Sequence, residues 1–179
     1  MKRKDQILGR RDFLIAAVAT STALLPGCKS TTSSGWEFLS DRAAQTLRVI
    51  CDQIVPTDDF PSASQAGVLT FIDRQLVRHL RRYREIYSDG LEQANLISRK
   101  LFGRDLNEAT AEQQFAVVSA LEKQNAVFFN LVRNHTFDGY YGAPRHGGNR
   151  DAVSWRMLGL TEPPLLGRSQ YDLQKESGQ

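Results

Sequence analysis

Residues 135–155 read HTFDGYYGAPRHGGNRDAVSW. This stretch follows neither a helical nor a strand period. Its four glycines allow backbone conformations that are closed to other residues, and Pro144 restricts the backbone locally. Its tyrosines and Trp155 carry large rings that favour one buried face and one wet edge. Because this aromatic content argues against disorder, we expect a long structured loop that presents a surface.

The chain on the N-terminal side of this loop predicts an all-α fold. Apolar residues recur at helical spacing in five stretches, near residues 41–55, 68–87, 91–102, 111–123 and 125–137, and few segments alternate with period two. Ser40 is placed to cap the first helix, which Pro56 ends, and Thr110 with Gln113 has the spacing of a capping box. Gly90 permits a break between the second and third helices. We therefore expect a single small domain of about five helices at residues 41–160, followed by an extended tail at 161–179.

Residues 1–27 have the organisation of an export signal. A charged head precedes a mostly apolar run that is too short to span a bilayer comfortably but suits a signal peptide. Arg10 and Arg11 stand just before this run and are followed closely by Phe13 and Leu14, a pattern that resembles the twin-arginine export signal. The alternative is a general secretory signal that happens to carry two arginines.

Cys28 ends the sequence Leu-Pro-Gly-Cys, which resembles a lipobox, the signal for acylation and cleavage at cysteine. Residues 28–40 are then a tether between a lipid anchor and the domain. An uncleaved anchor and a nearby cut by the ordinary signal peptidase are the alternatives. Cys51, the second of the two cysteines, falls on an apolar helical stripe and is expected to be a buried, inert thiol. A bond between Cys28 and Cys51 is the competing possibility.

The basic isoelectric point, near 9.0, belongs to the N-terminus. From position 28 onward the chain has 18 basic and 18 acidic residues, which gives no support to nucleic-acid binding. The helix expected at 68–87 nevertheless concentrates cations. They form either a solvated face or a docking stripe for an acidic partner or lipid head groups, and they are Arg74, Arg78, His79, Arg81, Arg82 and Arg84.

His135, Asp138 and His146 are the nearest approach to a metal or acid/base site, although hydrogen bonding that orders the loop is the alternative role. Asp58 and Asp59 lie in a turn-rich segment without a nearby third ligand, which favours a solvated turn or a helix cap. No serine lies in a G-x-S-x-G elbow. The sequence therefore gives little support to an enzyme that acts alone, and no catalytic, cofactor-binding or metal residue is assigned.

Two segments carry a resemblance to a known family. Residues 56–68 fit the pattern P-x-D-D-x-P-x-A-x-x-A-G-V, and residues 142–151 fit G-x-P-R-x-G-G-N-R-D, with Trp155 following. From about residue 44 to residue 160 the chain resembles the gluconate 2-dehydrogenase subunit 3 family. This resemblance implies a small, exported, membrane-associated periplasmic subunit of a flavin-dependent sugar or polyol dehydrogenase.

The resemblance also implies partners. A large subunit holds FAD and oxidises the alcohol, a multi-haem cytochrome c accepts the electrons, and the small subunit carries no cofactor. It helps the flavoprotein mature and takes it through the twin-arginine translocon, with a lipid anchor in the membrane. The loop is then the candidate interface, either docking the flavoprotein or merely covering the domain's own core, with these residues singled out: His135, Tyr140, Tyr141, Pro144, Arg145, Gly147, Gly148, Asn149, Arg150 and Trp155. The alternative function is a free-standing periplasmic metal- or ligand-binding lipoprotein.

Overall fold

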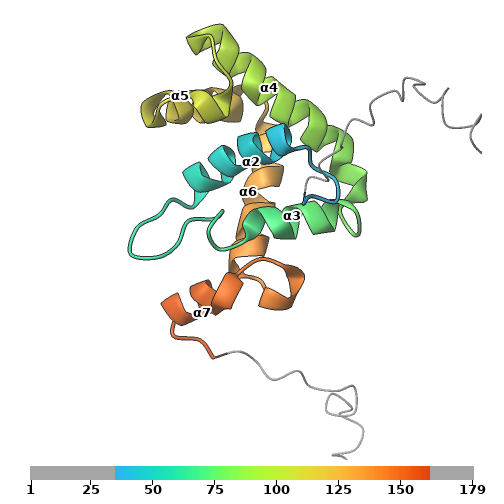
Figure 1. The fold of residues 1–179 in the computed structure, drawn as a ribbon, viewed down its shortest axis with the longest axis vertical. Helices are drawn as coiled ribbons and strands as arrows, with labels where there is room; N and C mark the ends of the chain where they lie inside the picture. The colour runs from blue at the N-terminus through green and yellow to red at the C-terminus, as the bar shows by residue number, and fades with distance from the viewer. Residues whose placement is uncertain (1–34, 162–179) are drawn as a thin grey trace, which may run out of the picture. The chain divides into compact units, whose positions relative to one another are not determined.

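A computed structural model describes residues 35–161, and in this range the chain is helical without β-strands. Figure 1 shows the α-helices, which are α2 (Asp41–Ile54), α3 (Val68–Leu76), α4 (Arg84–Phe102), α5 (Ala111–Gln124), α6 (Ala126–Tyr141) and α7 (Val153–Met157). Short 3₁₀ turns lie between them: η1 (Arg81–Tyr83), η2 (Leu106–Glu108), η3 (Pro144–His146) and η4 (Arg150–Ala152). The expected all-α fold is confirmed. The export signal, Cys28 and the tail beyond residue 161 lie outside the described residues.

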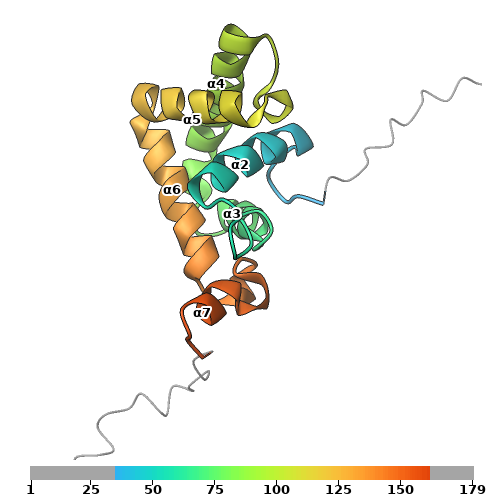
Figure 2. The ribbon, with the colours of Figure 1, turned by 90° about the vertical axis from the view of Figure 1, so that its left-hand side faces the viewer.

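Helix α6 is the central element of the domain. It contacts α2, α3, α4, α5 and α7. Figure 2 shows α5 at one end of α6 and α7 at the other, with α2 and α3 along its length. The core between these helices is made by fully buried side chains that include Leu47, Ile50, Tyr87 and Phe128. In the described part of the chain no helix is long and apolar enough to cross a membrane.

Local sequence signals fix several helix ends as expected. The Ser40 hydroxyl accepts a hydrogen bond from the Ala43 amide at 3.2 Å and caps α2. Thr110 and Gln113 form the complete capping box of α5, with both reciprocal bonds present. Gly103 ends α4 in the left-handed conformation, with φ at 71°. These three ends depend on residues within one turn of the boundary, which is why the sequence predicts them.

The prediction of one continuous helix over residues 68–87 is wrong, because α3 ends at Leu76 and α4 begins at Arg84. The backbone amides of Arg78 and Leu80 both donate to the Gln75 carbonyl, which turns the chain. The Arg84 side chain reaches back and donates from Nε to the Leu76 carbonyl at 2.7 Å. A carbonyl left free at the end of α3 is thereby satisfied, and the chain changes direction into α4.

The sequence predicts a helix break at Gly90, but the structure shows none. Gly90 lies inside α4. A Cβ atom at Gly90 would lie 2.2 Å from Cγ of the buried Phe128 ring on α6. The absence of a side chain therefore lets α4 and α6 approach closely. The position is glycine for packing between helices, and the sequence alone does not reveal this.

The loop expected from residue 135 begins later, since α6 continues to Tyr141. His135, Thr136, Gly139 and Tyr140 are buried on this helix. Polar and small residues on the buried face hide the helical period, because a period is recognised by its apolar residues. The glycine is again a packing position: a Cβ at Gly139 would lie 2.8 Å from the Phe71 ring.

Candidate docking surface

Asn149 is the residue that organises the loop after α6. It is buried and lies in the left-handed region, with φ at 45°. Its side-chain amide donates to the Gly142 carbonyl at 2.9 Å, and its side-chain oxygen accepts from the Ser154 amide at 2.9 Å. Asn149 therefore ties the start of the loop to the start of α7, and a residue that tolerates positive φ is required there.

The two motif segments that carry the family resemblance contact one another. The Arg150 amide donates to the Ala66 carbonyl at 2.8 Å, and just before the second segment the Tyr140 hydroxyl of α6 donates to the Pro61 carbonyl at 2.8 Å. The backbones also approach closely, because a Cβ at Gly67 would lie 2.9 Å from the Gly147 carbonyl oxygen. A Cβ at Gly148 would lie 2.1 Å from the carbonyl oxygen of Gly139 on α6. Gly67 and Gly148 are thus required by close packing.

The structure divides the expected interface residues into two groups. His135, Tyr140, Gly148 and Asn149 are buried and build the domain, so their side chains are not presented to a partner. The remaining six are exposed or half-buried around the loop, and they are Tyr141, Pro144, Arg145, Gly147, Arg150 and Trp155. Trp155 is held in place by a hydrogen bond from Nε1 to the Tyr141 carbonyl at 2.8 Å.

His135 packs in the domain interior instead of facing a ligand. Its Nδ1 lies 2.9 Å from the Tyr87 hydroxyl, and the two rings stack with centroids 5.9 Å apart. Burial lowers the pKa of His135, while the nearby Asp138 carboxylate acts in the opposite direction. The neutral imidazole is the form that this environment favours.

The metal site considered at His135, Asp138 and His146 is not formed. Among residues 35–161 no group of three or more His, Cys, Asp or Glu side chains can hold a metal ion. His135 is buried against Tyr87, whereas Asp138 and His146 are exposed. The Asp58 carboxylate accepts the Phe60 amide at 2.8 Å, so this aspartate orders an exposed turn, as expected.

Cys51 is a free, fully buried thiol. Thr136 on α6 donates its hydroxyl hydrogen to the Cys51 sulfur at 3.3 Å. Burial raises the pKa of the Cys51 thiol to about 12, so the reactive thiolate is disfavoured. The expectation of a buried, inert cysteine is confirmed.

An exposed aromatic surface, of which the sequence singled out only Tyr141, lies beside the loop. Phe115 on α5 is 64% exposed, and Phe137 and Tyr141 on α6 are 40% and 41% exposed. We call these three residues the aromatic strip. A groove of about 310 Å³ lies along the strip and is lined by residues that include Ile54, Phe115, Val118, Phe129, Arg133 and Phe137.

The aromatic strip joins the loop at Tyr141. The Phe137 and Tyr141 rings are 6.2 Å apart, and the Tyr141 carbonyl holds Trp155. Exposed aromatic side chains that border a groove are typical of protein-binding surfaces. No sequence signal selects Phe115 or Phe137, because their exposure is decided by how α5 and α6 pack in the domain.

The fold and this surface define the class: a small all-α domain whose central helix leads into a tightly packed, glycine-rich loop. The family model for gluconate 2-dehydrogenase subunit 3 matches residues 41–161, from the first residue of α2 to the last described residue. The chain therefore belongs to the gluconate 2-dehydrogenase subunit 3 family. Comparison with curated proteins and with solved structures gives no match.

Proposed function

We propose that this protein is the non-catalytic small subunit of a membrane-associated, periplasmic, FAD-dependent dehydrogenase, and that it assists the maturation and twin-arginine export of the FAD subunit. The observation that carries the proposal is the family match across residues 41–161, which covers every helix described. The family description names a subunit of a dehydrogenase, and the catalytic FAD and the haem c of the complex belong to partner subunits.

Export of a partner follows from the order in which a flavoprotein is made. A flavoprotein that folds around FAD in the cytoplasm needs a route that accepts folded proteins. The signal can then be supplied by a bound partner. In this proposal Arg10, Arg11, Phe13 and Leu14 address the assembled pair to the twin-arginine translocon, and acylated Cys28 holds it to the membrane afterwards. A multi-haem cytochrome c is the third subunit and receives the electrons.

The aromatic strip and the exposed part of the loop are the proposed docking surface for the flavoprotein. Tyr141, Arg145 and Trp155 are of the residue types that dominate binding energy at interfaces. The closely packed motif segments behind them hold the backbone in place before the partner arrives, which reduces the entropy lost on binding.

The carrier role is tested by changing the signal while leaving the domain intact. Arg10→Lys with Arg11→Lys keeps the charge but removes the arginine pair, so we expect the FAD subunit to remain in the cytoplasm and periplasmic dehydrogenase activity to be lost. Fractionated cells that express both subunits provide the measurement. Arg3→Lys with Lys4→Arg is the matched control and should leave export unchanged. Normal periplasmic activity in the first variant would refute the carrier role.

A further inference from the structure

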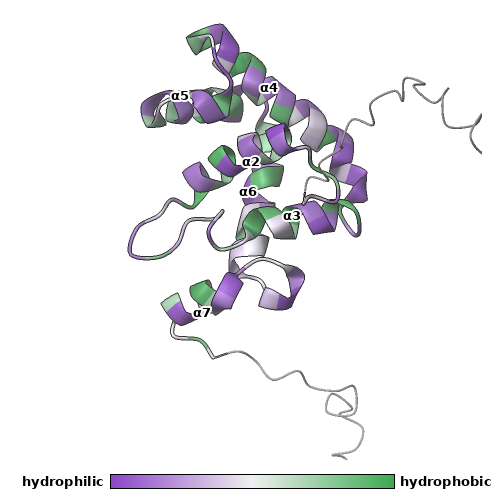
Figure 3. Ribbon diagram, viewed as in Figure 1, coloured by the Kyte–Doolittle hydropathy of each residue, from purple (hydrophilic) through white to green (hydrophobic). Residues whose placement is uncertain are grey.

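Residues 74–84 read RQLVRHLRRYR and hold five arginines and His79, without an acidic residue among them. We call the set Arg74, Arg78, His79, Arg81, Arg82 and Arg84 the basic corner. Every member except Arg84 is exposed, and Arg84 is half-buried. Figure 3 shows the hydrophilic colour where α3 ends and α4 begins.

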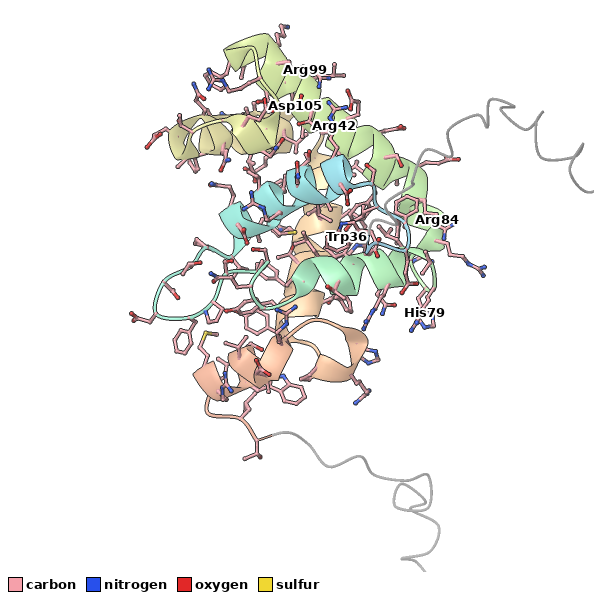
Figure 4. The ribbon with its side chains drawn as sticks, viewed as in Figure 1. Trp36, Arg42, His79, Arg84, Arg99 and Asp105 are labelled. Carbon is pink, nitrogen blue, oxygen red and sulfur yellow. The ribbon has the colours of Figure 1, made fainter. Side chains whose placement is uncertain are left out.

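Among residues 35–161, the cations of the basic corner lack the ion pairs that other arginines make. Arg42 and Arg99 share Asp105 and Glu92, with nitrogen–oxygen distances of 2.6 to 3.4 Å. By contrast, no carboxylate within residues 35–161 lies within 4.0 Å of a basic-corner cation. Figure 4 shows the paired cluster near Arg42 and Asp105, and His79 and Arg84 at a separate edge of the domain.

The turn between α3 and α4 presents these side chains together. Arg84 is fixed by its bond to the Leu76 carbonyl, and Arg82 lies 4.7 Å from the centre of the Tyr83 ring. The positive surface extends toward the loop, because a Cβ at Gly147 would lie 3.1 Å from a guanidinium nitrogen of Arg74. From residue 28 onward the chain is therefore neutral only in its total charge, while its basic residues gather at this corner.

The N-terminal tether meets the domain at the basic corner. The buried Asp73 carboxylate, next to Arg74, accepts the backbone amides of Glu37, Phe38 and Leu39 at 2.7, 2.9 and 2.9 Å. The Arg84 guanidinium lies 5.2 Å from the centre of the Phe38 ring. Trp36, on the same stretch of the tether, lines a groove together with Arg48 of α2 and Leu69 of α3.

Cys28 is seven residues before Gly35, the first described residue. An extended chain of that length spans at most about 25 Å. An anchor at Cys28 therefore keeps Gly35 within about 25 Å of the bilayer surface, so the side of the domain that receives the tether stays near the membrane.

We propose that the basic corner binds anionic phospholipid head groups and so sets which side of the domain faces the membrane. The proposal rests on the membrane association proposed above. Guanidinium groups donate paired hydrogen bonds to phosphate oxygens, and juxtamembrane clusters of basic residues are attracted to anionic lipid. Tyr83, half-buried beneath the Arg82 guanidinium, and Trp36, half-buried on the tether, carry rings of the kind that favour the bilayer interface.

The position of the tether favours lipid over an acidic protein as the ligand. A docking site for a protein can lie anywhere on the domain, whereas a lipid-binding site must be near the anchor. The basic corner meets this condition because Asp73 holds the tether one residue from Arg74.

The test compares two triple variants of the full chain, both with the N-terminal residues unchanged. Arg78→Gln, Arg81→Gln and Arg82→Gln remove three basic-corner cations that make no ion pair with residues 35–161. The matched control is Lys100→Gln, Arg104→Gln and Lys123→Gln, which removes the same charge. Helix α4 spans 19 residues, so its C-terminal end, where the control cations begin, is about 28 Å from the corner.

Co-sedimentation with phosphatidylglycerol–phosphatidylcholine vesicles at physiological salt measures the binding. Each basic residue near an anionic surface contributes about fivefold, so the corner variant should partition about a hundredfold more weakly and the control less than about threefold. Binding to pure phosphatidylcholine vesicles, which reports the apolar signal, should be equal for all three chains. Circular dichroism melting curves should coincide, which shows that the variants are folded.

Equal loss of vesicle binding in both variants, or no loss in either, would overturn the proposal. So would a corner variant that keeps vesicle binding but no longer co-purifies with the FAD subunit, because the patch would then be a protein-docking site. Failure of this proposal is distinguishable from failure of the carrier role, since the latter is measured by periplasmic dehydrogenase activity of the arginine-pair variant.

Discussion

Gly90 shows at the scale of one residue why a glycine cannot be interpreted from its neighbours alone. The sequence places it between two apolar runs, which predicts a break. In the structure it lies within α4 because the buried Phe128 ring occupies the space of its missing side chain. The role of Gly90 is therefore decided by Phe128 on α6, which lies 38 positions away in the sequence.

We predict that Gly90→Ala destabilises the domain. Alanine favours helix by about 1 kcal/mol over glycine. The new Cβ would, however, lie 2.2 Å from Cγ of Phe128, whose ring is fully buried and packs edge-on against Tyr87. Overpacking of this kind costs about 1 to 3 kcal/mol, so the clash should outweigh the helix gain in urea unfolding.

Two controls separate this clash from a general effect on α4. Ser88→Ala on the exposed side of the same helix should change the free energy of unfolding by less than about 0.5 kcal/mol. Combining Gly90→Ala with Phe128→Leu should cost less than the sum of the single variants, because the smaller side chain makes room. A stability gain in Gly90→Ala would contradict the packing role.

His135 and Tyr140 show a second limit of prediction at this scale. Both residue types occur at interfaces, and the sequence therefore assigns them to a surface. In the structure His135 and Tyr140 are both buried, and each has a hydrogen-bond partner. The Tyr87 hydroxyl pairs with His135, and the Pro61 carbonyl accepts the Tyr140 hydroxyl. Their partners lie 48 and 79 residues away, which no local pattern reveals.

At the scale of elements, the predictable boundaries are those set by nearby residues. The caps at Ser40 and Thr110 and the end at Gly103 are of this kind. The break between α3 and α4 is different, because the apolar spacing continues past it to Leu80. The turn is stabilised by Arg84, whose side chain caps the end of α3, and long-range capping by arginine has no fixed sequence spacing.

The strap formed by residues 35–40 is an element without regular structure that depends on one carboxylate. We predict that Asp73→Asn loosens it, because the amide group replaces one acceptor with a donor and removes the negative charge that faces three backbone amides. Hydrogen bonds to charged groups contribute more than neutral ones, so we expect a loss of about 1.5 to 3 kcal/mol. Faster hydrogen exchange at Glu37, Phe38 and Leu39 would localise the effect.

Asp89→Asn on the exposed face of α4 is the control for this substitution. It changes the charge equally and should leave both stability and exchange near residue 38 unchanged. If Asp73→Asn leaves exchange at the three amides unaltered, the strap is held by the packing of Trp36 and Phe38 and not by the carboxylate.

At the scale of the whole molecule, the sequence predicts the fold class and the family but not the arrangement of the surface. The all-α domain follows from helical periodicity, and the two motif segments carry the family resemblance. The aromatic strip depends on which side chains of α5 and α6 remain uncovered after packing. That outcome is set by the whole set of helix contacts, so Phe115 and Phe137 could not be selected beforehand.

We predict that Phe115→Ser with Phe137→Ser weakens association with the FAD subunit by about tenfold or more, because aromatic anchors dominate binding at protein interfaces. Phe115 and Phe137 are 64% and 40% exposed and lie outside the buried core, so the free domain should remain folded. Co-purification of the two subunits at graded concentrations measures the effect. Leu96→Ser with Leu101→Ser removes two equally exposed apolar residues from α4 and is the matched control. Equal weakening by both pairs would argue against a docking role for the strip.

The three amides that converge on Asp73 also determine how the domain responds to force. A pull on the N-terminus acts on residues 37–39 before it reaches α2. Because one side chain holds all three bonds, the load is shared in parallel and passes into the middle of the domain through α3. Helix α2 is thereby shielded from being peeled away one turn at a time, and the tension is borne by α3, most of whose residues are buried.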